Sequence, residues 1–308
     1  MAKHPCIVLA VPALAIVFAV ACLGQEYPVL RSPHPFPGSR LLLPNPVSES
    51  KRTAVLMLHG SEGGSAFLIK PEADILASQG FAVLLLCYFD CQRGLVGPRQ
   101  TLRNVDVSVV TNAIAWLRQQ EWSNGKVAVY GFSRGGELAM VIGALHTSTE
   151  KQPSALIAHS PSDVNNSSWN WSWREPGCWI CTRASCPGPV PQPGHQWNSA
   201  CGPDDERRMD FSVSAWLIDG IAIPTGRRIE VERIDRPVLI TVGAEDQTWP
   251  PDQTRRIEAA MRAAGHSPEV HYFPAAGHVF GGDDENRRRA LVLHFLRRLH
   301  EASSSPSQ

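Results

Sequence analysis

The sequence predicts an α/β protein built on a doubly wound, mostly parallel sheet. Short, continuous apolar segments recur along the chain, which is typical of strands buried on both faces. Segments of helical periodicity separate them, and this alternation places helices on both sides of a parallel sheet. The 308 residues are enough to build one large domain with a sizeable core.

The alternation runs from residue 54 to residue 299 with one long interruption. In chain order, the expected strands are 54–58, 81–87, 126–130, 155–159, 237–242 and 269–273, and the expected helices are 71–79, 102–119, 135–145, 252–264 and 286–299. We therefore expect one domain over residues 52–300. An extended lead-in over 22–51, rich in proline and serine and with room for one edge strand, precedes it, and a disordered tail over 301–308 follows.

The interruption covers residues 161–233, which contain four cysteines, many prolines and no long periodic segment. We interpret it as an inserted lid. Its aromatic side chains could stack on a substrate near the mouth of a site, or could form a small core that holds the lid together. Both alternatives concern five tryptophans: Trp169, Trp171, Trp173, Trp179 and Trp197.

The first 21 residues resemble a signal peptide. An apolar run over 7–20 follows a basic start, and small residues at Ala19 and Ala21 suit a cleavage site. The run is shorter than the roughly 20 residues of a spanning helix, so we expect a secreted or periplasmic protein with no stable membrane span after cleavage. Cys22, directly after the cleavage site, leaves lipoprotein anchoring as an alternative.

The cysteines and the charge balance limit the kinds of site and partner that we expect. In an exported chain, an even set of cysteines first indicates disulfides, although one C-x-x-C pair leaves a zinc site as an alternative. The 29 basic and 29 acidic side chains balance, so we expect no nucleic-acid partner. We expect no metal or organic cofactor, and interpret the arginines at 287–289 and 297–298 as a solvated helix face. The six cysteines of the expected mature body are Cys87, Cys91, Cys178, Cys181, Cys186 and Cys201.

A G-x-S-x-G motif at residues 131–135 lies between an expected strand and an expected helix. This is the context of a nucleophile elbow, in which a tight turn lifts the serine hydroxyl above the sheet. The flanking glycines are needed because a side chain would clash in such a turn. Ser133 is therefore the predicted nucleophile, and the chain is predicted to have the α/β-hydrolase fold.

A serine hydroxyl needs a base to accept its proton and an acid to orient that base, and in this fold they follow in the order serine, acid, histidine. His278 follows the last expected strand, and Asp246 follows the strand before it. We expect His278 to be the general base and Asp246 the orienting acid. The weaker candidates for the acid are Glu245, Asp252 and Asp163.

The oxyanion of a tetrahedral intermediate needs two backbone N–H donors. Arg134, directly after the nucleophile, is the first, and Ser61 is the second, with Glu62 as its alternative in the glycine-rich turn after the first expected strand. Trp249 is the best candidate for lining a substrate pocket. We expect His59 in that turn to be structural, and Glu137 to act only as a negative charge near a helix N-terminus. The turn spans residues 59–64.

Three segments, 102–106, 131–138 and 243–250, resemble the C-terminal domain of acyl-CoA thioesterases and bile acid-CoA:amino acid N-acyltransferases. Dienelactone hydrolases are similar more loosely. The resemblance covers residues 52–160 and 234–298 and implies an α/β-hydrolase fold with a serine or cysteine nucleophile. The inserted segment and the leader depart from that family's pattern.

These features together predict a serine hydrolase that cleaves carboxylic esters of small molecules through an acyl-enzyme. An acyl-CoA thioesterase or acyltransferase is the alternative, because the resemblance implies thioester substrates. A peptidase or a non-catalytic binding protein fits less well, since the serine, acid and histidine occur intact and in order.

Overall fold

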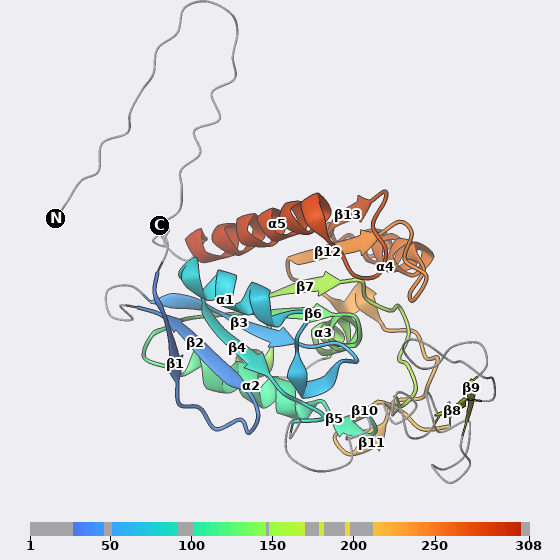
Figure 1. Ribbon diagram of the computed structural model, residues 1–308. Coiled ribbons are helices and arrows are strands. Elements are labelled where there is room, and N and C mark those ends of the chain that lie inside the picture. Colours follow the sequence, from blue (N-terminus) through green and yellow to red (C-terminus); the bar gives the residue numbers. More distant parts are fainter. Residues whose placement is uncertain are drawn as a thin grey trace, which may run out of the picture.

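The computed structural model describes residues 27–45, 51–91, 102–145, 148–169, 179–181, 195–197 and 212–302. Their main feature is an eight-stranded sheet in the order β1-β2-β4-β3-β6-β7-β12-β13, in which neighbouring strands from β4 to β13 are parallel (Figure 1). The predicted fold class is confirmed. The parallel strands are β3 (Arg52–Leu58), β4 (Ala82–Leu86), β6 (Ser123–Phe132), β7 (Ala155–His159), β12 (Val238–Gly243) and β13 (Glu269–Phe273).

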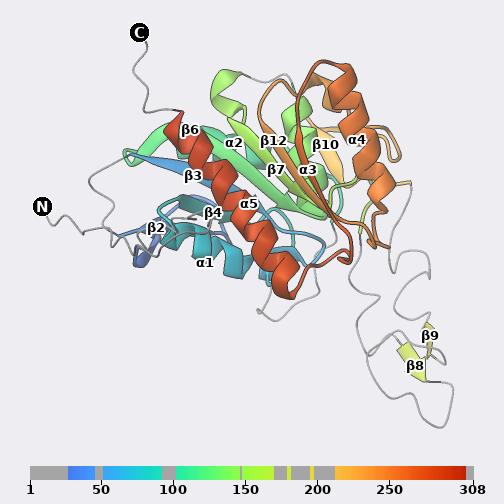
Figure 2. The ribbon, with the colours of Figure 1, turned by 90° about the horizontal axis from the view of Figure 1, so that it is seen from above.

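Helices cover both faces of this sheet (Figures 1 and 2). Side chains of β3 alternate between two cores: Val55 and Met57 pack with α1 and α5, whereas Leu56 and Leu58 pack with α2, α3 and α4. This period-two division makes the sheet hydrophobic on both sides. The helices are α1 (Lys70–Ser78), α2 (Ser108–Arg118), α3 (Arg134–Ala144), α4 (Pro251–Ala263) and α5 (Gly282–Glu301).

The N-terminal lead-in contributes two strands where at most one was expected. β1 (Val29–Ser32) and β2 (Arg40–Pro44) form an antiparallel hairpin, and β2 pairs antiparallel with β4. Leu41, Leu42 and Leu43 are buried, so this hairpin belongs to the main sheet. Short strands around a proline-rich turn give little periodicity, which is why the sequence pattern did not reveal both.

The predicted start of the helix at residue 102 is wrong. The helix begins at Ser108, and β5 (Val105–Asp106) before it pairs parallel with β10 (Trp216–Ile218). The backbone N–H of Leu102 donates to Trp169 O at 2.8 Å. These groups bond to the inserted segment, so they are not available to a helix. The last helix, α5, begins four residues earlier than predicted.

Both ends of the inserted segment pack onto the body of the domain. Trp216 is fully buried in the main core with Ile223 and Ile229, and Trp169 packs against the same cluster. β10 also pairs with β11 (Ile221–Ala222), and β8 (Trp179–Cys181) pairs with β9 (His195–Trp197). A lid over residues 161–233 stays a prediction, and Trp171 and Trp173 lie outside the described residues.

The predicted signal peptide, Cys22, and residues 303–308 of the predicted disordered tail also lie outside the described residues, as do Cys178, Cys186 and Cys201. Glu301, the first residue of that predicted tail, is instead the last residue of α5. Cys87 and Cys91 form a disulfide, as an exported chain was expected to do. No helix in the described part of the chain is long and apolar enough to cross a membrane.

Arg288 contradicts the interpretation of the C-terminal arginines as a solvated face. It is buried, forms an ion pair with Glu72 of α1, and bonds Glu285 through Nε at 2.7 Å. Tyr130 of β6 donates its hydroxyl to Glu72 at 2.7 Å. The charge pattern could not separate this arginine from its exposed neighbours, because Glu72, the buried carboxylate that it pairs with, lies 216 residues away.

Candidate active site

The G-x-S-x-G turn joins the end of β6 to the start of α3. Ser133 has φ 54° and ψ −119°, a strained conformation that non-glycine residues rarely adopt. A Cβ on Gly131 would lie 1.9 Å from the carbonyl oxygen of Gly135, and one on Gly135 would lie 2.1 Å from that of Leu58. Only glycine fits at these two positions, so the local sequence enforces the turn.

Ser133, His278 and Asp246 form one chain of hydrogen bonds. The Ser133 hydroxyl lies 2.9 Å from His278 Nε2, and His278 Nδ1 lies 2.8 Å from Asp246 Oδ2. The other carboxylate oxygen, Oδ1, accepts the backbone N–H groups of Thr248 and Trp249 at 2.8 and 2.9 Å. The carboxylate is buried and held from both sides, so it can fix the tautomer and orientation of the imidazole.

The loops that carry the acid and the histidine touch each other. They follow β12 and β13, which are adjacent parallel strands, so both leave the same edge of the sheet. A Cβ on Gly243 would lie 2.2 Å from the carbonyl oxygen of Ala276, and Glu245 N donates to Ala276 O at 3.0 Å. The acid and the base are therefore positioned as one unit.

The rival acids lie elsewhere. Asp163 forms an ion pair with Arg256 through both carboxylate oxygens. Glu245 and Asp252 are exposed, and Asp252 pairs with Arg255. Of these four carboxylates, Asp246 is the one that forms a hydrogen bond with His278.

The predicted oxyanion residues flank Ser133. Arg134 is the first residue of α3, so its N–H is one of the donors that a helix N-terminus leaves without a helical partner. On the other side, a Cβ on Gly60 would lie 3.2 Å from Ser133 Cβ, which places the glycine-rich turn against the nucleophile. Ser61 and Glu62 follow Gly60 directly, and Glu62 is buried. Their role as donors stays a prediction.

His59 is part of the support for this turn. It is fully buried, its Nδ1 donates to Gly60 O at 3.0 Å, and its ring stacks on Tyr88 at 4.2 Å between centroids. The hydroxyl of Tyr88 donates to His59 O at 2.5 Å. Burial lowers the pKa of His59 to about 4, so at neutral pH it is a neutral structural group.

The pKa of His59 predicts that the protein loses stability as the pH falls from about 6.5 to about 4. In that window the unfolded chain binds a proton that the folded protein excludes, which lowers the free energy of unfolding by about 3 kcal/mol in total. His59→Phe keeps a ring beside Tyr88 and should flatten this pH dependence. Urea unfolding at several pH values measures it, and identical slopes for the two proteins would contradict the prediction.

The Cys87–Cys91 disulfide closes a loop that packs against the oxyanion turn. A Cβ on Gly64 would lie 2.5 Å from the carbonyl oxygen of Asp90 and 2.7 Å from Cys87 Sγ. A Cβ on Gly63, which has φ 68°, would lie 2.8 Å from Asp90 Cβ. The loop closed by the disulfide, residues 87–91, thus packs against the turn 59–64, which lies beside Ser133.

Removing this disulfide should cost both stability and rate. Closing so short a loop accounts for about 2 kcal/mol of unfolding free energy on the chain-entropy model. We expect the Cys87→Ser/Cys91→Ser protein to unfold at a lower urea concentration. We also expect its kcat to fall by a larger factor than its KM changes. Dithiothreitol should lower the kcat of the wild type by a larger factor than that of the double variant, which already lacks this disulfide; equal losses in the two proteins would refute the effect on rate.

Trp249 lies at the edge of the site. Its ring stands nearly perpendicular to the imidazole of His278 at 5.8 Å between centroids. The guanidinium carbon of Arg134 lies 5.9 Å from the centre of the same indole. The ring is partly exposed beside the histidine, so Trp249 can contact a substrate there, as its spacing from Asp246 suggested.

Glu137 lies in the first turn of α3, as expected, but it does more than place a charge near the helix end. Its side chain is completely buried and accepts a hydrogen bond from Trp216 Nε1 at 2.7 Å and from Arg134 Nη1 at 3.2 Å. Asn166 donates to it twice, through its backbone N and its Nδ2, each at 2.8 Å. Glu137 therefore joins both ends of the inserted segment to the residue that follows the nucleophile. The sequence pattern missed Asn166 and Trp216, because neither lies in a motif.

The described residues contain no group of three or more histidine, cysteine or acidic side chains that could hold a metal ion. The zinc alternative for the cysteine-rich run is not tested, since most of that run lies outside them. A serine, a histidine and a buried carboxylate joined by hydrogen bonds in this order form the arrangement that acyl-transfer chemistry uses.

The strained serine between β6 and α3, on a doubly wound sheet, defines the protein as an α/β-hydrolase. Residues 105–281, more than half of the chain, match the family "BAAT / Acyl-CoA thioester hydrolase C terminal". The chain belongs to this family, which confirms the resemblance read from its motifs.

The chain is also similar to curated proteins, among them an acyl-coenzyme A thioesterase. The chain is 24% identical to Acyl-coenzyme A thioesterase 1 of Rattus norvegicus over 252 residues, covering 80% of this chain and 49% of that protein. It is 26% identical to the Acylamino-acid-releasing enzyme of Rattus norvegicus over 267 residues, covering 81% of this chain and 32% of that protein. The chain spans half or less of the length of these relatives.

Solved structures share the fold. Esterase 2 of Thermogutta terrifontis phosphonylated by sarin aligns with a TM-score of 0.51 at 20% identity, covering 85% of this chain and 90% of that one. A putative dienelactone hydrolase of Klebsiella pneumoniae subsp. pneumoniae MGH 78578 aligns with a TM-score of 0.52 at 14% identity, covering 84% and 92%.

Proposed function

We propose that this protein is a serine hydrolase that cleaves carboxylic esters through an acyl-enzyme. The observation that carries the proposal is the hydrogen-bond chain from Ser133 through His278 to the buried Asp246. A hydroxyl 2.9 Å from an imidazole nitrogen, with the opposite nitrogen held by a carboxylate, is the arrangement that activates a serine.

Acylation begins when the Ser133 oxygen attacks the ester carbonyl and its proton passes to His278 Nε2. Asp246 stabilises the imidazolium that forms, and backbone N–H groups of Arg134 and of Ser61 or Glu62 bind the oxyanion. The intermediate collapses with cleavage of the bond to the leaving group. His278 returns the proton to that group, which departs as an alcohol.

Deacylation repeats these steps with water as the nucleophile. His278 takes a proton from the water molecule as its oxygen attacks the acyl carbon, and a second oxyanion forms in the same place. Collapse of this intermediate breaks the bond to Ser133, which regains its proton from His278. The products are a carboxylic acid and the free enzyme.

Acyl-CoA thioester hydrolysis is the second candidate, and the family match favours it. The same residues would act, and the leaving group would depart as a thiol in place of an alcohol. The two activities therefore differ in what binds the leaving group, not in the chain of proton transfers.

Turnover of two substrate sets distinguishes these candidates. We would measure hydrolysis of p-nitrophenyl esters from acetate to laurate beside acyl-CoA thioesters of the same acyl lengths. A higher kcat/KM for the esters supports the esterase, and a higher value for the thioesters assigns the protein to the second candidate. No turnover of either set would overturn both.

We also propose that the protein is exported, with cleavage after Ala21. The support is the small-residue pattern at Ala19 and Ala21 and the Cys87–Cys91 disulfide, since disulfides persist mainly in oxidising compartments. Intact-mass analysis of the protein recovered from culture medium or periplasm should give a chain that starts at Cys22. Recovery of the full-length chain from the cytoplasm alone would reject this proposal.

A further inference from the structure

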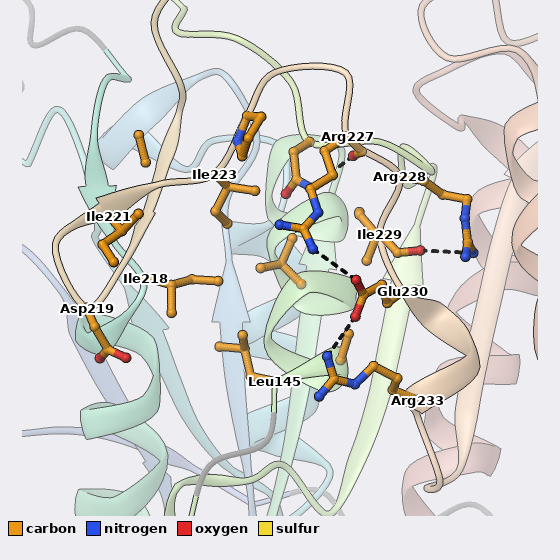
Figure 3. Close-up of a pocket in the computed structure, with 15 residues that line it drawn as sticks. Leu145, Ile218, Asp219, Ile221, Ile223, Arg227, Arg228, Ile229, Glu230 and Arg233 are labelled. Carbon is orange, nitrogen blue, oxygen red and sulfur yellow. Dashed lines mark hydrogen bonds and ion pairs between the residues drawn. The ribbon is translucent and has the colours of Figure 1, made fainter.

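A cavity of about 320 Å³ lies at the end of α3 that is remote from Ser133 (Figure 3). Val141 and Leu145 at the helix end form one wall, and the returning part of the inserted segment, residues 218–233, forms most of the rest. At about 1.5 Å per residue, the eleven residues of α3 separate this cavity from the nucleophile by roughly 16 Å. The cavity is therefore a different place from the catalytic site.

The walls of the cavity are aliphatic. Figure 3 shows Leu145, Ile218 and Ile223 around one space, with Ile221 at its margin. Ile221 is 74% exposed, which is unusual for so large an apolar side chain. The described lining contains no aromatic ring to stack on a base or a sugar, so an alkyl group suits the cavity best.

The charged side chains at the edge of the cavity, taken with their partners, balance one another, since three are arginines and three are carboxylates. They are Arg227, Arg228, Arg233, Asp219, Glu230 and Glu232. Arg227 Nη2 and Arg233 Nη1 each donate to Glu230, at 3.0 and 2.6 Å, and Arg228 donates two hydrogen bonds to Glu232 (Figure 3). The edge thus offers a ligand no excess charge of either sign, and an uncharged ligand fits it best.

Hydrogen bonds within the protein hold the walls in place. Both the backbone N and the Nδ2 of Asn165 donate to Arg227 O at 2.9 Å, and Ile223 N donates to Trp216 O at 3.0 Å. A site that is already formed requires little ordering when a ligand binds. The volume also falls in the range of small-molecule pockets, which is about 300–1,000 Å³.

We propose that this cavity binds an uncharged aliphatic molecule of medium chain length. Its alkyl chain lies against Leu145, Ile218 and Ile223, and removes the exposed side chain of Ile221 from water. At about 30 Å³ per small group, the cavity holds about ten non-hydrogen atoms, which is close to the size of octan-1-ol. The apolar surface taken out of water drives the binding. The proposal goes beyond the hydrolase chemistry, because it uses none of the residues around Ser133.

Titration calorimetry with octan-1-ol tests the proposal on the wild-type protein. Octanoate and octylammonium are matched probes that have the same chain length and a charge of either sign. We expect octan-1-ol to bind more tightly than either ion, by about tenfold, because a charged group loses water on entry and meets charges that are already balanced. Binding of either ion as tight as that of octan-1-ol, or tighter, would overturn the proposal.

The length of the probe gives a second measure. Each methylene group that leaves water should tighten binding about threefold, so the affinity should rise about eightyfold from butan-1-ol to octan-1-ol. An affinity that does not depend on chain length would show that the aliphatic walls do not contact the chain, and would also overturn the proposal.

Variants then locate the binding site. Ile221→Ser should weaken octan-1-ol binding severalfold, and Ala222→Phe, which adds a large side chain to the lining, should weaken it at least about tenfold. Both residues are exposed, so neither change should harm the fold. Val279→Ser is the matched control, because Val279 is 54% exposed and follows His278 directly, outside the cavity.

We expect Val279→Ser to bind octan-1-ol as the wild type does. A loss of binding in Val279→Ser alone would place the probe at the catalytic site and overturn the proposal. Absence of octan-1-ol binding, or binding that both cavity variants leave unchanged, would overturn it as well, whatever the esterase assays show.

Discussion

Replacing Ser133 by alanine is expected to lower kcat at least about ten-thousandfold, because no other hydroxyl is held against His278 Nε2 by a recorded hydrogen bond in the described residues. The small change in volume should leave the fold intact. Hydrolysis of the best p-nitrophenyl ester, measured for both proteins, gives the factor. His278→Ala should produce a loss of similar size, since the serine and the histidine act as one unit.

Asp246→Asn is a second test that leaves the turn around Ser133 unchanged. Asp246→Asn keeps a side chain of the same shape, yet it no longer supports the imidazolium, and a loss of about ten-thousandfold is expected from comparable triads. If all three variants kept turnover within tenfold of the wild type, the assignment of these residues would be wrong. Circular dichroism and urea unfolding check that each variant is folded.

Replacing Glu137 by alanine should destabilise the protein by about 3–5 kcal/mol. The change leaves the buried guanidinium of Arg134 without its carboxylate and removes the acceptor used by Trp216 and Asn166. Because the backbone N–H of Arg134 is the predicted oxyanion donor, we also expect kcat to fall by about a hundredfold while KM changes little. Urea unfolding and steady-state kinetics measure the two effects.

Binding of a transition-state analogue distinguishes a displaced backbone N–H of Arg134 from a loss of stability alone. A boronic acid that forms a tetrahedral adduct with Ser133 should bind the Glu137→Ala protein more weakly, by about the same factor as kcat falls. Trp216→Phe removes one hydrogen bond to Glu137 and keeps a ring in place, so it should show a smaller change of the same kind. Glu72→Gln, at the buried carboxylate that pairs with Arg288, should lose stability and keep its affinity for the analogue.

The sequence was sufficient for the parallel sheet and for the three residues of the hydrogen-bond chain. Continuous apolar strands can only be buried on both faces, and the tight turn around Ser133 needs glycine at fixed positions, so both leave a local signature. The position of His278 and Asp246 after adjacent strands follows from the order of the elements. Their catalytic roles still await the variants described above.

What the sequence could not show depends on contacts between distant residues. Glu137 and Arg288 are charged side chains in helices, and nothing nearby in the chain distinguishes them from exposed charges. Glu137 is buried because Trp216, 79 residues away, folds back over it. The start of α2 was misplaced for the same reason, since Val105 and its neighbours bond to residues near 215 in preference to a helical partner.

The touching loops after β12 and β13 have a consequence for the chain as it is synthesised. The nucleophile and its glycines are complete once residue 135 has been made, whereas the acid and the base both come after the inserted segment. A nascent chain that ends before β12 contains a reactive turn with no partner to activate it. Because a domain generally folds as a unit, we expect activity only after the chain through His278 has been made and the loops after β12 and β13 have come together.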